Sequence, residues 1–401
     1  MIARDLLRVG RQAFWLFASL VAFKTALFFV GVMIARFGGA EALGVFSVSH
    51  TTLGVVLPLA GLGLSTLTLY RAAERADPAQ LGARHGMYLM ATTAAFVVVA
   101  LTISPLGGVV ALSFVATLWL LPALGQSWAG LSFAHGRGLA RPQREIVAGL
   151  LGAGVLAIGT LMAGSLQELG LACAASMLVF CAAVLHAVRK EPALMPRTPS
   201  WKEVRGAVAA SRGYFAVDAL LFALSTLDLF AVQFSLGAAG TGMLNAATVL
   251  PRNAAFVPLF VSLLAIGGAS VGQPRIRPRL LAFAALALWL IAAPIAWLLL
   301  PALSRAYALE LSPLQPTALA ALLSAPALFL MVALVPLAVA ENVREALAGL
   351  CAGLAVAALG ALVATPSHGA VGAVLAVGLG QLVAAAWAAV VLSRASGKGA
   401  G

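Results

Sequence analysis

The sequence predicts an all-α protein that crosses a membrane about twelve times, and three observations support this. Of the 401 residues, 62% are hydrophobic and only 9% are charged, whereas a soluble domain has about 25% charged residues. The apolar residues form continuous runs of helical length, without the period-two alternation of a membrane β-barrel strand. The few charged residues lie mostly between these runs. A soluble globular protein is therefore excluded.

Twelve apolar runs are long enough to cross the hydrocarbon core, which takes about 20 helical residues. The first run is too long for a cleavable signal peptide and contains Lys24, so we expect it to remain as a span. The runs lie at about 13–35, 43–69, 86–104, 108–131, 146–163, 169–188, 214–236, 242–270, 280–302, 317–340, 346–365 and 369–392.

The basic residues separate by side of the membrane. Lys and Arg number 25, and all but Lys24, Arg36, Arg252 and Arg305 fall in alternate hydrophilic segments: 1–12, 70–85, 132–145, 189–213, 271–279, 341–345 and 393–401. Cytoplasmic loops of membrane proteins are enriched in Lys and Arg. The pattern therefore predicts both termini in the cytoplasm. The net charge of +12 then reflects topology, and we expect no nucleic-acid partner.

The longest hydrophilic segment divides the chain into two sets of six spans. It predicts an N-lobe at 1–188, a cytoplasmic linker at 189–213 and a C-lobe at 214–401. The second half of the linker spaces Trp201, Val204 and Val208 as a short amphipathic helix at the membrane surface would.

The two halves of the chain resemble each other at corresponding places. The first predicted span ends in ARFGGAEALGVFSVSHTTL, residues 35–53, and the seventh in FSLGAAGTGMLNAATVL, residues 234–250. At an offset of 198 residues, Gly39 aligns with Gly237, Gly44 with Gly242 and Ser47 with Asn245. Because six spans are an even number, both halves have the same orientation, as in a parallel repeat.

These stretches, with PLAGLGLSTLTLYRAAE at 58–74, resemble the multidrug/oligosaccharidyl-lipid/polysaccharide (MOP) flippase superfamily, and among its branches the Wzx-type polysaccharide biosynthesis proteins. The resemblance implies two pseudo-symmetric six-helix lobes in a V-shaped bundle and a monomer in the bacterial inner membrane. It also implies alternating access that moves a polyprenyl-diphosphate-linked oligosaccharide, an O-antigen or lipopolysaccharide precursor, to the outer leaflet. Membrane lipids and glycan polymerase and ligase machinery are the expected partners.

Cations within the predicted spans are candidates for binding an anionic headgroup, because a charge in lipid is costly and usually faces a cavity or a partner. Lys24 lies near the middle of the first span. Asn245, Thr248 and Arg252 are spaced to form one polar helix face, on which the arginine fork would grip phosphate oxygens. A structural pair with an acidic residue is the alternative for either cation.

Other polar residues form a stripe and an acidic pair. Ser47 and His50 lie on the second span, where the histidine would contact sugar, carry a proton or bond another helix. Asp218 and Asp228 lie on the seventh span. Asp228, the deeper, is a candidate ion-coupling site or the counter-charge of Lys24 or Arg252, and Asp218 is either a second such site or solvated.

We expect no enzymatic activity, cofactor or metal, since no phosphate-binding Gly-rich loop and no metal-ligand spacing is found. Three other functions remain open. An ion-coupled exporter of small molecules on the same fold would use Asp218 and Asp228 to attract cations. A major-facilitator-type transporter is disfavoured because the loop RAAERADPAQLGARHG does not match its Gly-x-x-x-Asp-Arg pattern. The third is a non-transporting membrane scaffold or a glycan polymerase, and the short outer loops disfavour the polymerase.

Overall fold

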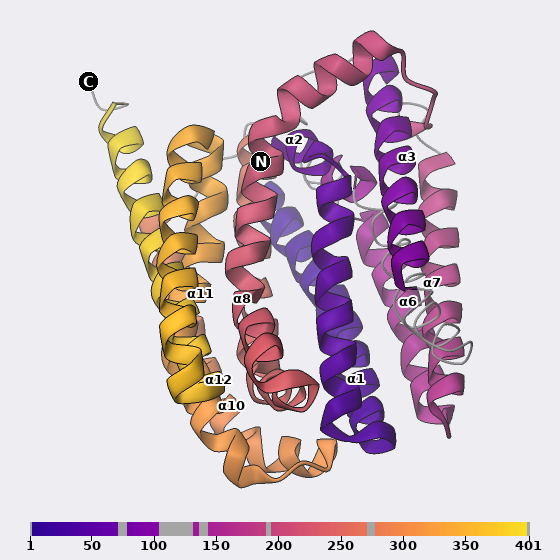
Figure 1. The fold of residues 1–401 in the computed structure, drawn as a ribbon. Coiled ribbons are helices and arrows are strands. Elements are labelled where there is room, and N and C mark those ends of the chain that lie inside the picture. Colours follow the sequence, from indigo (N-terminus) through magenta and orange to yellow (C-terminus); the bar gives the residue numbers. More distant parts are fainter. Residues whose placement is uncertain are drawn as a thin grey trace. The chain divides into compact units, whose positions relative to one another are not determined.

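The computed structural model describes residues 2–70, 78–103, 131–135, 143–189, 194–270 and 277–398, which are mostly helical and contain no strand. The helices are α1 (Ile2–Ala60), α2 (Leu64–Tyr70), α3 (Pro78–Ile103), α6 (Gln143–Met162), α7 (Leu166–Arg189), α8 (Trp201–Ala254), α9 (Phe256–Ser270), α10 (Pro278–Tyr307), α11 (Leu311–Glu341) and α12 (Val343–Lys398) (Figure 1). The predicted spans coincide with helix, except that nearly all of 108–131 lies outside the described residues. The all-α membrane architecture is thus confirmed, whereas the span count and the side of the termini stay predictions.

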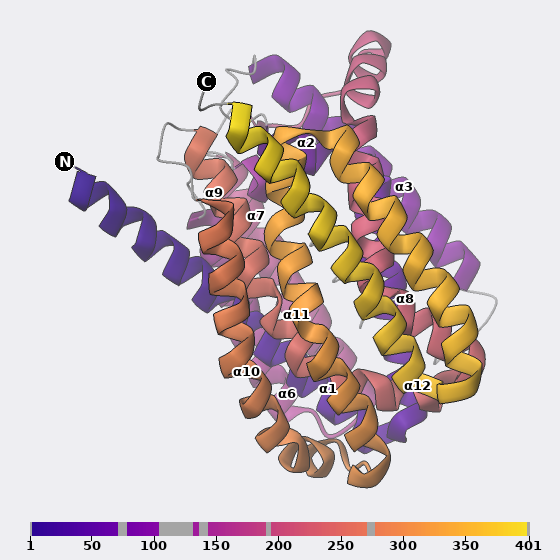
Figure 2. The ribbon, with the colours of Figure 1, turned by 90° about the vertical axis from the view of Figure 1, so that its left-hand side faces the viewer.

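The three longest helices each contain a break at a glycine with positive φ. The φ angles are 71° at Gly39 in α1, 72° at Gly237 in α8 and 59° at Gly369 in α12, a region that glycine enters without the penalty of a side chain. Each break separates two predicted spans. Figure 2 shows the two halves of α12 running back along each other. They approach so closely that a Cβ on Gly353 would lie 2.5 Å from the carbonyl oxygen of Gly380.

The chain packs into two compact units. The first contains Met1–Val30, Thr52–Asp218 and Gly267–Pro274, and the second contains Gly31–Thr51, Ala219–Ile266 and Arg275–Gly401. Helices α1 and α8 therefore contribute to both units. The lobe boundaries at 188 and 214 stay a prediction.

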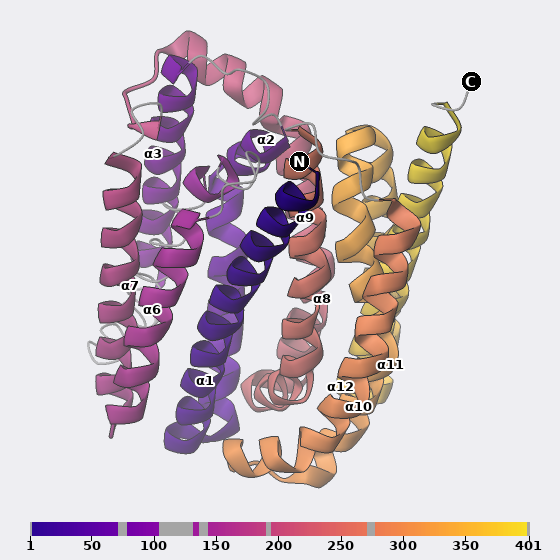
Figure 3. The same cartoon turned by 180° about the vertical axis from the view of Figure 1, so that it is seen from behind.

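The first unit is held by aromatic contacts and by close helix packing. Helices α6 and α7 lie side by side (Figures 1 and 3), and Ser176 donates a hydrogen bond from Oγ to the carbonyl oxygen of Gly152 at 2.7 Å. The ring of Phe180 lies 6.4 Å from Phe23 and 5.7 Å from Phe133. Small residues permit this close approach, which supplies much of the attraction between helices in lipid.

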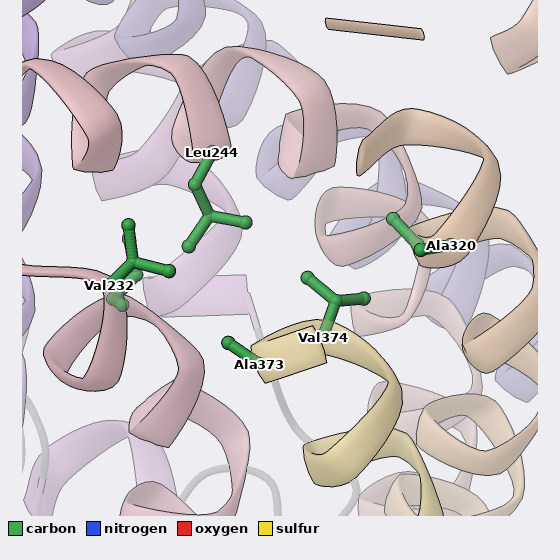
Figure 4. Packing of buried hydrophobic residues seen from close by; sticks show 7 residues of the cluster. Val232, Leu244, Ala320, Ala373 and Val374 are labelled. Atoms are coloured by element: carbon green, nitrogen blue, oxygen red, sulfur yellow. The ribbon is translucent and has the colours of Figure 1, made fainter. Parts of the chain in front are cut away.

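The core of the second unit joins α8, α11 and α12. Figure 4 shows its buried cluster, which consists of Leu229, Val232, Leu244, Ala320, Ala321, Ala373 and Val374. Polar contacts reinforce it: Gln381 Nε2 donates to the carbonyl oxygen of Leu224 at 3.2 Å, and Ser262 Oγ donates to that of Ala333 at 2.7 Å. The middle of α8 is therefore fixed within a packed core.

The described helices carry enough apolar surface for a multi-pass membrane protein. In the described ranges, seven helical stretches are long and apolar enough to cross a membrane, and two of them, Trp201–Ile266 and Val343–Ser396, each contain two predicted spans. Helix α10 exposes large apolar side chains such as Leu290 and Leu298, at 62% and 76%. In lipid this surface contacts acyl chains.

The linker between the predicted lobes is docked on α3. The backbone N–H of Arg197 donates to the carbonyl oxygen of Gly82 at 3.1 Å, and His85 Nδ1 hydrogen-bonds the carbonyl oxygen of Leu194. A Cβ on Gly86 would lie only 2.0 Å from the Arg197 carbonyl oxygen, so this seat requires glycine. Residues 194–197 of the linker are therefore held in place.

We predict that Gly86→Val displaces the linker from α3, because the obstructing atom belongs to the backbone and cannot rotate away. The loss of folding free energy should reach or exceed the ~1–3 kcal/mol that overpacking ordinarily costs. Limited trypsin digestion should show faster cleavage at Arg197 than in the wild type. Gly154→Val is the control, since nothing lies within 4 Å of a Cβ there. Equal cleavage in both variants would contradict the prediction.

Candidate functional site

A buried ion pair links the two segments of α8. Arg252, after the break at Gly237, donates from Nη2 to Oδ2 of Asp228, before the break. The side chains are only 22% and 7% exposed, respectively. The other carboxylate oxygen of Asp228, Oδ1, accepts from the backbone N–H of Leu229 at 2.9 Å. Both oxygens of Asp228 thus have a donor.

Because the ion pair is buried, each of its two charges depends on the other for stabilisation. Moving one charge out of water costs several kcal/mol that only a close counter-charge and hydrogen bonds repay. The neighbour Leu229 belongs to the apolar core of the unit, so little water is available to replace a lost partner. Arg252 can therefore leave Asp228 only for another anion, and Asp228 can leave Arg252 only for another cation or a proton.

The predicted polar face beside Arg252 is mostly turned inward. Thr248 is 3% exposed, and its Oγ1 donates to the carbonyl oxygen of Leu244 at 2.9 Å, within its own helix. Asn245 is half-buried. At the break itself, Thr241 Oγ1 lies 3.0 Å from Gln233 Oε1. The bond between Thr241 and Gln233 crosses the break, and with the ion pair it links the segment that carries Arg252 to the segment that carries Asp228.

In the first unit, Asp218 accepts hydrogen bonds from α2. Thr66 Oγ1 lies 2.9 Å and 2.8 Å from the two carboxylate oxygens. The ring of Tyr70, at the end of α2, stacks on Tyr214 at 5.5 Å, and a Cβ on Gly63 would lie 2.3 Å from the backbone nitrogen of Phe215. Asp218 is therefore a half-buried, hydrogen-bonded carboxylate rather than a freely solvated one.

The two repeats meet at a reciprocal glycine contact inside the second unit. A Cβ on Gly44 would lie 1.7 Å from the carbonyl oxygen of Ala238, and a Cβ on Gly242 would lie 1.9 Å from that of Ala40. Both pairs of positions obey the offset of 198 residues seen in the sequence. Ser47, one turn beyond Gly44, is 4% exposed and donates to the carbonyl oxygen of Leu43 at 2.6 Å. The repeat thus gives a symmetric, backbone-to-backbone contact.

The structure brings together only some of the predicted site residues. Of the two counter-charges proposed for Asp228, it pairs Arg252. Lys24 is half-buried on the part of α1 in the first unit, and the side chain of His50 lies outside the described residues. Among the described residues, no three His, Cys, Asp or Glu side chains gather as metal ligands would. Substrate binding by any of these residues stays a prediction.

Two features were missed by the sequence analysis. The partner of Asp218, Thr66, lies 152 residues away in sequence, and nothing in the local pattern indicates the pairing. The repeat identified Gly44 and Gly242 as equivalent, but equivalence does not imply contact. The missing signal in both cases is the packing of distant segments.

The fold is shared with multidrug and toxin extrusion (MATE) transporters. A point mutant of the Vibrio cholerae MATE transporter VcmN is 14% identical with a TM-score of 0.69, and the match covers 97% of each chain. An outward-facing multidrug resistance MATE transporter of the MOP superfamily is 15% identical with a TM-score of 0.67, covering 96% of this chain and 95% of that one. The eukaryotic MATE transporter AtDTX14 is 13% identical with a TM-score of 0.64, covering 96% of both.

At these identities the likeness shows the fold, including its division into two lobes. No protein-family model matches the chain, and no curated protein matches it. The MOP-type fold expected from the sequence is therefore confirmed, and the Wzx-type subdivision is not. Nothing in the comparisons supports a link to O-antigen or lipopolysaccharide.

Proposed function

We propose that the chain is an alternating-access membrane transporter, not an enzyme, and that it exports small molecules driven by an ion gradient. End-to-end likeness to MATE transporters, one of them described as a multidrug resistance protein, supports this proposal. In the sequence analysis this was the alternative to a lipid-linked oligosaccharide flippase. The structural likeness favours the exporter.

The ion pair of Asp228 and Arg252 is the observation that carries the proposal. A headgroup flippase would use Lys24 and Arg252 together to bind a diphosphate, but Arg252 is already neutralised by Asp228. A carboxylate can instead release its arginine when it binds a proton or a metal cation. Because the ion pair links the two segments of α8 across the break, this exchange would let ion binding change how the segments are held together. Exchange of partner at Asp228 is thus the proposed coupling step.

The flippase remains the second candidate, because Lys24 places a cation within a span. In that case the chain would move a lipid-linked oligosaccharide to the outer leaflet of the bacterial inner membrane, beside glycan polymerase and ligase. Both candidates use alternating access. They differ in cargo and in the residue on which transport depends.

The test is transport by the purified full chain in liposomes. We expect efflux of the cationic dye ethidium when a proton or sodium gradient is imposed, and loss of at least tenfold in Asp228→Asn. Glu341→Gln, at an exposed helix end, is the matched control and should keep wild-type efflux. Gradient-independent movement of a fluorescent polyprenyl-diphosphate sugar, abolished by Lys24→Ala, would reject the exporter and establish the flippase.

A further inference from the structure

The first turns of α8 present a basic and aromatic stripe that no described residue covers. Trp201, Arg205, Val208 and Arg212 are all exposed, Trp201 by 77% and Val208 by 40%. At 3.6 residues per turn these four positions share one helix face, within an arc of roughly 60°. Lys202 is exposed beside them. This face differs from the Trp201, Val204 and Val208 face expected from the sequence, since Val204 is half-buried.

The start of this helix is fixed by a capping box. Ser200 and Glu203 exchange hydrogen bonds: Glu203 Oε2 accepts from the Ser200 backbone N–H at 2.8 Å, and Ser200 Oγ accepts from the Glu203 N–H at 3.4 Å. Glu203 also pairs with Arg197, which belongs to the linker docked on α3. These donors lower the pKa of the Glu203 carboxyl. The stripe is therefore presented by a helix with a defined start.

Position along the chain places the stripe at the membrane surface. The predicted seventh span begins at 214, directly after these first turns of the same helix. At a rise of 1.5 Å per residue, Trp201 lies about 20 Å of helix from the start of the span. This is farther than the roughly 5–8 Å depth of one headgroup layer, so the stripe lies at that depth where the first turns run along the membrane surface. In Figure 1 these turns are tilted away from the part of α8 that follows them. In Figures 1 and 3 the first turns of α8 lie at the end of α3, beyond its first residues.

The positive charge of the stripe favours an anionic lipid headgroup. Arg197 is neutralised by Glu203, whereas Lys202, Arg205 and Arg212 pair with no carboxylate in the described part of the chain. Unpaired cations beside a tryptophan suit the interface, because Trp prefers headgroup depth and Arg binds phosphate oxygens with two donors. A zwitterionic headgroup offers no net charge to balance them. An anionic one does.

We propose that Trp201, Lys202, Arg205, Val208 and Arg212 form a binding surface for anionic phospholipid headgroups. The stripe binds their phosphates while Trp201 and Val208 enter the acyl boundary. This holds the start of α8 against the leaflet, independently of what the chain transports. Each basic residue near an anionic surface strengthens binding about fivefold.

The test uses the detergent-purified full chain, with lipid adducts measured by native mass spectrometry during titration with phosphatidylglycerol or phosphatidylcholine. The wild type should retain phosphatidylglycerol preferentially. The triple variant Lys202→Gln, Arg205→Gln, Arg212→Gln should bind it about a hundredfold more weakly, and Trp201→Ala should weaken binding of both lipids. A matched triple, Arg277→Gln, Arg279→Gln, Arg394→Gln, removes the same charge from exposed positions elsewhere and should keep the preference.

Two outcomes would overturn the proposal. Equal loss in both triples would mean general attraction to a basic protein. If the triple variant of Lys202, Arg205 and Arg212 keeps the lipid preference and the unfolding temperature of the wild type, the stripe does not bind lipid headgroups. A protein partner would then be the better explanation of its exposure. Because all three substituted side chains are exposed, we expect the variant to fold, and thermal unfolding of the two triples checks this directly.

Discussion

Replacing Gly44 or Gly242 by valine is expected to abolish transport while leaving the protein in the membrane. A Cβ at either position would lie less than 2 Å from a carbonyl oxygen of the other repeat, at 1.7 Å and 1.9 Å. The obstructing atoms are backbone, so the two segments must separate. The penalty should exceed the ~1–3 kcal/mol of ordinary overpacking, which would reduce the population with this contact closed by more than about a hundredfold.

The contact can be followed separately from transport. In a background where the three cysteines are replaced by alanine, Ser47→Cys reports opening, because Ser47 is 4% exposed beside Gly44. Thiol labelling of this cysteine should be slow alone and fast when combined with Gly242→Val. Gly154→Val is the control, as a side chain there meets open space. Wild-type efflux and slow labelling in the Gly242→Val protein would show that the contact plays no part in the cycle.

The long-range order of this fold was predictable because lipid imposes strong rules on sequence. Continuous apolar runs must be helices, since the membrane offers no partner for free backbone groups. The breaks were predictable as well: Gly39 and Gly237 stand at equivalent places in the repeat, and their φ and ψ angles agree within a degree or so, at 71° and −170° and at 72° and −169°.

The candidate site was predictable in its residues but not in its contacts. A charge within a span must have a partner or a cavity, which singled out Asp228 and Arg252, but the same rule allowed Lys24 as the partner. The choice between Lys24 and Arg252 depends on the break at Gly237, where the direction of α8 changes and brings Arg252 back to Asp228. The bond from Thr66 to Asp218 and the close approach at Gly44 depend on how distant helices pack. In a chain this rich in Ala and Gly, many packings satisfy the same hydrophobic pattern.

Removing either charge of the ion pair alone should destabilise the protein, and removing both should restore it. Asp228→Leu leaves Arg252 without its counter-charge, and Arg252→Met leaves Asp228 without its own. Breaking a buried pair costs about 3–5 kcal/mol, whereas replacing both members by apolar groups of similar size is often neutral. Unfolding titrations in mixed micelles should give a coupling free energy of at least about 3 kcal/mol in the double-mutant cycle.

The exposed pair of Arg197 and Glu203, with side chains 42% and 29% exposed, is the matched control, and its cycle should give a much smaller coupling free energy, because water screens exposed charges. The double variant of Asp228 and Arg252 then separates stability from coupling. If Asp228 carries the coupling ion, this stable protein still fails to export ethidium against a gradient, because no carboxylate remains to exchange partners. Full export by the stable double variant would assign the pair to structure alone and would remove the basis for ion coupling at Asp228.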